Sequence, residues 1–289
     1  MQSMKDRIIG KFRRTFMRNS YSISGEKSLK NRINLEWWSK KVNVGDELAN
    51  VIYSYMLERR GLSPDHFTKK TIHLMTVGSL VGMKNFDAVI WGSGVHVYAN
   101  VQKLINNRKT VKLDIRAMRG PVTKSALEAC GYNCQKAVMG DPAILMPDIY
   151  MPENFEKKHK ISLILHIKTK DIEEKKKMYN CISVETRDYK KFIDEIVQSE
   201  LIISSSLHGI ILAEMYGVPA VFMNENGLMD AEIMKFKDWY FSTGRENVII
   251  SYSVEDALNL GPMELPEKEK IEEMKKGLLE SFPYDLWES

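Results

Sequence analysis

Cysteine is scarce in this 289-residue chain, and none of its three cysteines belongs to a CxxC pair. An odd, sparse set of thiols excludes a disulfide scaffold and indicates a reducing compartment, so we expect a cytoplasmic protein. The six histidines lack HxxxH or HExxH spacing, and we therefore expect no metal site. No apolar run reaches the ~18 residues of a membrane span, and no signal-peptide core follows the basic start.

The net positive charge is also small, at +4, and it is concentrated in residues 1–20. Six basic residues against the single acid Asp6 give this segment a charge of +5, which leaves the rest of the chain at −1. Because the body of the chain is close to neutral, a globally basic nucleic-acid-binding protein is excluded, and we expect no nucleic-acid partner. With 44% hydrophobic and 28% charged residues, the composition is that of a folded globular protein.

The N-terminal segment has a helical pattern. Met4, Ile8, Phe12 and Phe16 recur every four residues, and Lys and Arg occupy the opposite face. Residues 19–31 are polar and are typical of a linker. The basic amphipathic helix could lie on the anionic inner face of the cytoplasmic membrane, as a peripheral contact through residues 1–20, or it could pack on the first lobe of the protein. The sequence leaves both open.

Short apolar runs alternate with helical segments through the remaining sequence. The predicted strands are 33–39, 71–77, 87–92, 110–116, 137–145, 161–167, 179–185, 201–206 and 219–224. Continuous Val, Ile and Leu strands between helices indicate parallel sheets that are covered on both faces. We therefore predict an α/β protein with two Rossmann-like lobes and an active-site cleft between them, at the carboxyl ends of the strands.

The domain boundaries follow from one Pro-rich, charged stretch at 146–160, which is the best candidate for a linker. We assign residues 1–31 to the N-terminal segment and linker, 32–150 to the N-terminal lobe and 151–262 to the C-terminal lobe. Residues 263–289 are expected to form a C-terminal helix, which could cross back to the first lobe.

The segment 201–224 has the clearest functional pattern. An apolar strand ends in Ser204, Ser205 and Ser206 and continues directly into a helix near His208. Serines cap helices, and the free N–H groups of a helix start suit a phosphate or carboxylate. His208 at this position is a natural general acid or base, and Gly209 allows close approach. The alternative is that the serines only cap the helix and His208 packs beside them.

Three further strand ends carry candidate residues. Asn43, Gly45 and Asp46 precede a helix, where Asp46 either caps it or meets sugar hydroxyls. Arg119 comes just before the helix that starts at Pro121, where its guanidinium either binds an anion or forms a surface ion pair. The Gly92–Gly94 turn is too short for a GxGxxG nucleotide site and indicates tight backbone packing. The other candidates are Asp141, which either caps or faces the cleft, and Lys168 and Arg187 in the second half.

These segments occur in one order along the chain: NVGDELANVI, WGSGV, RGP, GDPAIL and SSSLHGIILAEMYGVPAV. Together they resemble the polysaccharide pyruvyl transferase family, from about Ile33 to Asn224. The SSSLHG…AE..GVPA segment is the most specific part of the resemblance, and the NVGDE loop is second.

The resemblance implies a two-lobed, GT-B-like fold and transfer of pyruvate from phosphoenolpyruvate to a sugar or lipid-linked oligosaccharide. The product would be a ketal in an exopolysaccharide, capsule or cell-wall polymer. Phosphoenolpyruvate is the co-substrate, and neither a further cofactor nor a metal is implied. Many relatives carry arginine where this chain has Ser206, so another cation, Lys168 or Arg187, is needed at the donor.

Roles can be assigned on this basis. We expect His208 and Asp46 to be catalytic, with His208 moving protons near the donor. The donor residues are expected to be Arg119, Ser204, Ser205, Ser206, Leu207, Gly209, Lys168 and Arg187. The acceptor residues are expected to be Asn43, Gly45, Asp46, Gly92, Ser93, Gly94 and Asp141.

Two alternatives stay open. A glycosyltransferase of the same architecture would use a nucleotide sugar, although WGSG is the only, poor, candidate for a nucleotide pocket. A non-catalytic scaffold for envelope biosynthesis is the other, because Ser206 departs from the family pattern. The sequence identifies neither the acceptor sugar nor the oligomeric state.

Overall fold

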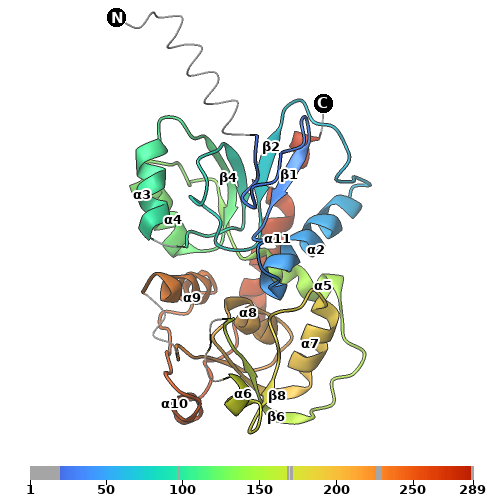
Figure 1. Ribbon diagram of the computed structural model, residues 1–289, viewed down its shortest axis with the longest axis vertical. Helices are drawn as coiled ribbons and strands as arrows, with labels where there is room; N and C mark the ends of the chain where they lie inside the picture. Colours follow the sequence, from blue (N-terminus) through green and yellow to red (C-terminus); the bar gives the residue numbers. More distant parts are fainter. Residues whose placement is uncertain (1–19, 97, 168, 170–171, 226–229, 288–289) are drawn as a thin grey trace, which may run out of the picture.

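A computed structural model describes residues 20–96, 98–167, 169, 172–225 and 230–287 (Figure 1). It contains two parallel β-sheets, of five and four strands, which confirms the predicted α/β class. The predicted N-terminal amphipathic helix falls in residues that lie outside the described part of the chain. Within the described residues, no helix is both long and apolar enough to cross a membrane.

The first sheet has the strand order β1-β2-β3-β4-β5, and its strands match the first five predicted runs. The strands are β1 (Ile33–Glu36), β2 (Ile72–Met75), β3 (Ala88–Trp91), β4 (Leu113–Met118) and β5 (Val138–Met139). Every residue of β2 and β3 is buried, which explains why these strands are continuous apolar runs. The helices after β1, β3 and β4 are α2 (Val44–Glu58), α3 (Tyr98–Asn107) and α4 (Pro121–Ala129).

The second sheet has the order β7-β6-β8-β9. Its strands are β6 (His159–Ile164), β7 (Asn180–Cys181), β8 (Ser199–Ser204) and β9 (Ala220–Phe222). The accompanying helices are α6 (Ile172–Lys175), α7 (Tyr189–Val197), α8 (Leu207–Met215), α9 (Asp230–Ser242) and α10 (Val254–Leu260). Helix α8 is buried from Leu207 to Glu214, so its sequence is apolar on all sides.

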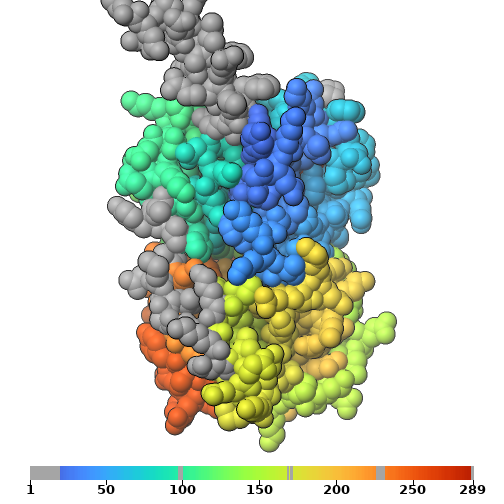
Figure 2. All heavy atoms as spheres, viewed as in Figure 1, coloured from blue at the N-terminus to red at the C-terminus, as the bar shows by residue number. Residues whose placement is uncertain are grey.

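The two halves share one hydrophobic core, which includes Ile52 of α2 and Ile211 of α8. The chain passes from β5 through η1 (Pro142–Leu145) and α5 (Met146–Ile149) into the second half. Helix α11 (Lys268–Ser281) and η2 (Tyr284–Leu286) follow the second half, and α11 packs against β4 and β5 of the first sheet. Figure 2 shows the first half, in blue to green, above the second half, in yellow to orange.

Candidate active site

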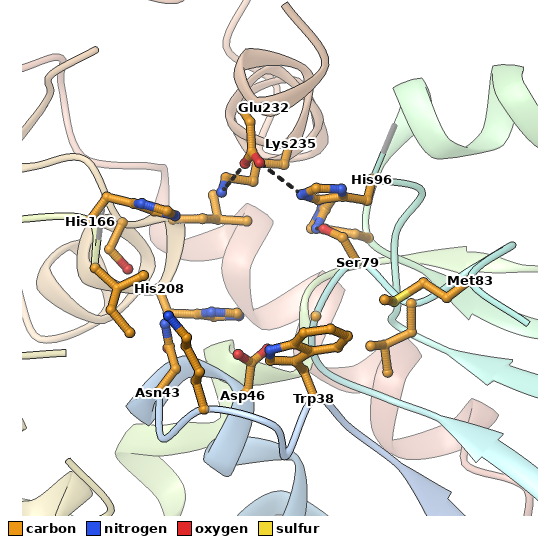
Figure 3. Close-up of a pocket in the computed structure, with 17 residues that line it drawn as sticks. Trp38, Asn43, Asp46, Ser79, Met83, His96, His166, His208, Glu232 and Lys235 are labelled. Carbon is orange, nitrogen blue, oxygen red and sulfur yellow. Dashed lines mark hydrogen bonds and ion pairs between the residues drawn. The ribbon is translucent and has the colours of Figure 1, made fainter. Parts of the chain in front are cut away.

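A cavity of about 390 Å³ lies between the two sheets, where the carboxyl ends of their strands meet (Figure 3). This is the edge at which parallel α/β sheets commonly bind ligands. Both halves of the chain contribute side chains. The lining residues are Trp38, Lys41, Asn43, Asp46, Gly78, Ser79, Leu80, Met83, His96, Arg119, His166, Ile167, Ser206, Leu207, His208, Glu232 and Lys235.

The N-terminus of α8 opens into this cavity. Ser206 is its N-cap, but the Ser206 side chain accepts no hydrogen bond from the helix. Among the described residues, none accepts a hydrogen bond from the N–H groups of residues 207–209. A helix start with free amides carries partial positive charge, so it can bind an anion.

The other two serines of this motif lie beneath the cavity. The Ser204 hydroxyl donates to the Ile164 carbonyl over 3.0 Å, and the Ser205 hydroxyl accepts from the His166 N–H over 2.7 Å. A Cβ atom at position 209 would lie 2.5 Å from the Ser204 Oγ. Any residue other than glycine would therefore keep α8 farther from the end of β8. These residues position the helix start, and Ser206 and Leu207 reach the cavity.

His208 joins the two most specific sequence motifs. A Cβ atom at Gly45 would lie 2.3 Å from the His208 Nδ1, so the glycine provides the space for the imidazole. On its other side, the His208 Nε2 lies 3.6 Å from the Asp141 Oδ2. Both are buried polar atoms without a closer partner in the described residues.

Asp141 is fully buried below His208 and does not line the cavity. Burial raises the pKa of its carboxyl, but His208 and the Ala143 N–H more than offset this, and the net result is a lowered pKa. An ionised carboxylate next to an imidazole fixes the orientation of the ring and stabilises its protonated form. Asp141 therefore supports His208.

Asp46 lies in the first turn of α2 and lines the cavity. The Asn43 side chain caps this helix by accepting from the Gly45 N–H over 2.9 Å. Burial raises the pKa of Asp46 to about 6, against the opposing effect of His208 and Lys235. A carboxyl with this pKa exchanges its proton near neutral pH, which suits general acid–base chemistry.

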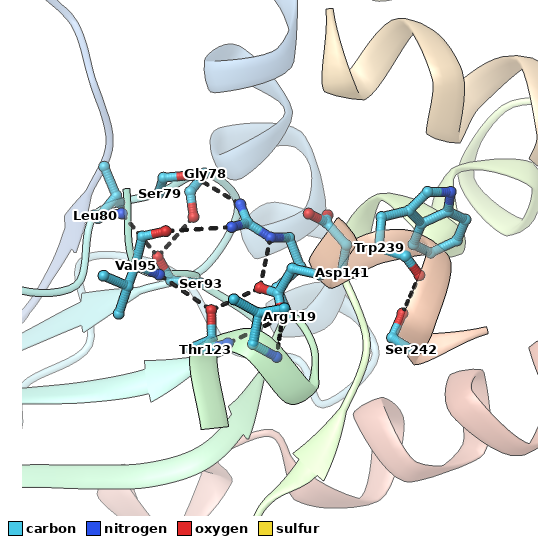
Figure 4. Close-up of polar contacts among 12 residues, drawn as sticks. Gly78, Ser79, Leu80, Ser93, Val95, Arg119, Thr123, Asp141, Trp239 and Ser242 are labelled. Carbon is cyan, nitrogen blue, oxygen red and sulfur yellow. Dashed lines mark hydrogen bonds and ion pairs between the residues drawn. The ribbon is translucent and has the colours of Figure 1, made fainter. Parts of the chain in front are cut away.

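Arg119 reaches the cavity from the end of β4, but it is buried and already has a counter-ion (Figure 4). Its Nε donates to the Asp238 Oδ2 over 3.1 Å, and its Nη1 donates to the Ser79 Oγ over 2.8 Å. The guanidinium packs across Gly94, where a Cβ atom would lie 2.3 Å from its Nη2. An anion in the cavity would therefore share this cation with Asp238.

Asp238, from α9 in the second half, also caps α4 in the first half. Its carboxylate accepts from the Val122 and Thr123 N–H groups over 2.9 and 3.0 Å, and from the Thr123 hydroxyl over 2.6 Å. The N-cap residue itself, Gly120, has no side chain to do this. One buried carboxylate thus closes a helix and holds Arg119 across the two halves.

The remaining predicted residues that the structure describes lie outside the cavity lining. Gly92 has a φ of +90° and packs on Pro142, while Ser93 ties two loops together through the Gly78 carbonyl, at 2.8 Å. The Arg187 side chain is 71% exposed and lies 3.4 Å from the Glu47 carboxylate. Lys168 is outside the described residues.

Part of the cavity wall was not predicted from the sequence. Lys235 and His96 both contact Glu232, at 2.8 and 3.0 Å, and the hydrogen bond from His96 is the largest cause of a strongly lowered Glu232 pKa. Trp38 and Ser79 were also missed, although the glycine after the strand at 71–77 marked the Ser79 loop. In the described part of the chain, no three His, Cys, Asp or Glu side chains converge into a metal-binding group.

Comparisons with known proteins give one matching family model and several similar proteins. A sequence model described as polysaccharide pyruvyl transferase matches residues 43–227. The chain is 24% identical over 250 residues to the succinoglycan biosynthesis protein ExoV of Rhizobium meliloti, covering 83% of this chain and 70% of ExoV. It is 25% identical over 228 residues to an uncharacterized protein of Acanthamoeba polyphaga mimivirus, covering 74% and 75%. A crystal structure of a functionally uncharacterized protein from Klebsiella pneumoniae covers 88% of this chain and 100% of that one, with 15% identity and a TM-score of 0.46.

Proposed function

The chain belongs to the polysaccharide pyruvyl transferase family, and we propose that it transfers the pyruvyl group of phosphoenolpyruvate to a sugar as a ketal. The acceptor would be a sugar or a lipid-linked oligosaccharide in the synthesis of a surface polysaccharide or cell-wall polymer. The observation that carries this proposal is one cavity that combines an open helix start with the imidazole of His208 and the carboxyl of Asp46, whose pKa is raised to about 6.

The donor would bind at the α8 end of the cavity. Phosphoenolpyruvate carries a carboxylate and a phosphate, and both suit free amides and cationic side chains. The amides of residues 207–209 and the guanidinium of Arg119 would bind these groups. Lys235, which lines the same cavity, supplies a cation that the chain lacks at Ser206.

The chemistry needs an acid and a base. His208 would protonate C3 of phosphoenolpyruvate while the oxygen of one sugar hydroxyl bonds to C2 and Asp46 takes the proton of that hydroxyl. A second hydroxyl oxygen then bonds to C2 as the bond from C2 to the phosphate oxygen breaks. Its proton leaves with inorganic phosphate, and the cyclic ketal remains. Return of the proton from Asp46 to His208 through water restores both groups. Asp141 would keep the His208 ring oriented through both steps.

Ligand-dependent stabilisation tests this proposal. We expect phosphoenolpyruvate to raise the Tm of the protein in thermal denaturation, and we expect UDP-sugars and GDP-sugars to leave the Tm unchanged. Phosphate release from phosphoenolpyruvate that depends on an added acceptor glycan would then establish transfer. Stabilisation by a nucleotide sugar would replace the proposal with glycosyl transfer, and stabilisation by none of the ligands would favour a non-catalytic scaffold.

A further inference from the structure

One wall of the cavity is apolar and aromatic. Trp38, Leu80 and Met83 line it, and all three come from loops that follow β1 and β2 of the first sheet. Figure 3 shows Trp38 and Asp46 at one edge of the cavity and Glu232 and Lys235 at the opposite edge. Lys235, a cation that suits a phosphorylated donor, therefore lies across the cavity from a surface that suits an uncharged ligand.

Trp38 is held as a half-buried side chain at this wall. It packs against the core cluster that includes Leu80, and the Nζ of Lys40 lies 5.3 Å from its ring centroid. In the described residues, its indole N–H donates to no acceptor, and this N–H is not enclosed by protein. The adjacent Trp37 differs, because it does not line the cavity and its indole N–H is buried.

We propose that Trp38 is the platform of the acceptor subsite, where one face of a pyranose ring packs on the indole. This inference rests on the proposed function and adds the class of ligand and its binding mode. A pyranose presents C–H groups on its faces and hydroxyls around its edge, so an aromatic face covers the apolar part while the edge stays free. The free indole N–H adds a donor for one hydroxyl.

This placement also brings the reacting hydroxyls to the base. Asp46 and Asn43 line the cavity together with Trp38. Trp38 and Asn43 come from the segment that links β1 to α2, and Asp46 comes from the first turn of α2. A ring stacked on Trp38 would therefore direct its hydroxyl edge toward Asp46 and toward a donor held at residues 206–209. Trp38 contacts the acceptor without taking part in proton transfer.

Saturation-transfer NMR with the methyl β-D-pyranosides of glucose, galactose and mannose tests the subsite on the full chain. The wild type should transfer saturation to the ring C–H protons of at least one sugar. Trp38→Leu should weaken that sugar's binding about three- to tenfold, whereas Trp37→Phe should leave it unchanged. All variants should keep the phosphoenolpyruvate-dependent rise in Tm.

Tryptophan fluorescence gives a second measurement that does not depend on the folding of the leucine variant. The change in tryptophan fluorescence on adding the sugar should be lost in Trp38→Phe and kept in Trp37→Phe. Equal sugar binding by the wild type and Trp38→Leu, or no binding of any pyranoside by the wild type, would overturn the subsite. Sugar binding without stabilisation by phosphoenolpyruvate would instead count against the proposed function.

Discussion

Helices α4 and α8 both start where a parallel strand ends at the cleft, and neither N-cap residue closes its helix with a side chain. At α4, the carboxylate of Asp238 accepts from the free amides and is 1% exposed. At α8, no described residue accepts from the amides of residues 207–209, and Leu207 and His208 line the cavity. The same kind of helix end is thus filled by a protein carboxylate in one half and open in the other.

The start of α4 is an anion site that the protein fills with its own carboxylate, whereas the start of α8 is an anion site that is open to a ligand. Asp238 shows what such a helix end binds, which is a carboxylate with a guanidinium beside it. The open end of α8 offers the same chemistry to a carboxylate or phosphate from outside. Because Asp238 comes from the second half and α4 from the first, the filled end also ties the halves together and leaves the open end as a fixed site.

Removing the proton-transfer group at the open end should have the largest effect. His208→Asn, which keeps a donor toward Asp141, should lower kcat by about 10²- to 10⁴-fold, because a positioned acid or base contributes this much. The measurement is acceptor-dependent phosphate release from phosphoenolpyruvate, with His66→Asn on an exposed loop as the control. Turnover of the His208 variant close to the wild type would remove His208 from the mechanism.

Removing the Asp238 carboxylate from the start of α4 should destabilise the fold. Asp238→Ala leaves Arg119 buried without its counter-ion, which typically lowers the free energy of unfolding by about 3–5 kcal/mol. The matched control is Asp285→Ala, which breaks an exposed pair with Arg116 at 2.9 Å and should cost less than about 1 kcal/mol. Urea denaturation measures both, and equal losses would contradict the structural role of Asp238.

The strands of both sheets could be predicted because parallel strands buried on two faces leave continuous apolar runs. Helices α3, α5, α6 and α10 were not predicted. Helix α10 has only seven residues and buries only Ala257, so it leaves no helical stripe in the sequence.

The site was predictable only where local motifs carry it. Asn43, Asp46, Arg119, Ser206 and His208 all follow strands and all line the cavity. Residues 92–94, by contrast, are buried against Pro142 and Arg119 and do not line the cavity. A glycine motif therefore marks close packing as readily as ligand contact. The Arg119–Asp238 pair could not be foreseen, since the two residues are 119 positions apart and no local pattern records a contact between the halves.

Asp46 allows a comparison of stability at two pH values. Its pKa is raised from 3.8 to about 6, so the folded state binds more protons than the unfolded state between these values. Stability therefore falls as the pH rises through this window, and above pH ~6 the buried charge costs on the order of 2–3 kcal/mol. Asp46→Asn should be more stable than the wild type at pH 7.5, with the gain fading toward pH ~4.

Urea denaturation at both pH values checks this, with Glu47→Gln as the control because it removes an acid from the same helical turn. The gain at pH 7.5 should be larger for Asp46→Asn than for Glu47→Gln. A variant that is less stable than the wild type at pH 7.5 would contradict the cost assigned to the Asp46 carboxylate. Loss of turnover in the more stable Asp46→Asn variant would show that the protein tolerates the destabilising Asp46 carboxylate because its function needs it.

The smallest expected effect comes from a substitution that places a carboxylate at the open start of α8. Ser206→Asp places a carboxylate where it can accept from the first amides of α8, as Asp238 does at α4. Ser and Asp are similar N-caps, so stability should change by less than about 1 kcal/mol. The new carboxylate should compete with phosphoenolpyruvate and weaken its binding about tenfold, the factor that 1.4 kcal/mol represents.

Ser206→Asn separates charge from shape, because asparagine caps equally well and is neutral. Titration calorimetry with phosphoenolpyruvate, and with inorganic phosphate alone, should give weaker binding for the aspartate variant than for the asparagine variant. Equal binding by the two would mean that the α8 amides do not hold the donor anion. In that case, Arg119 and Lys235 would have to bind both anionic groups of the donor, although each already contacts a carboxylate of the protein.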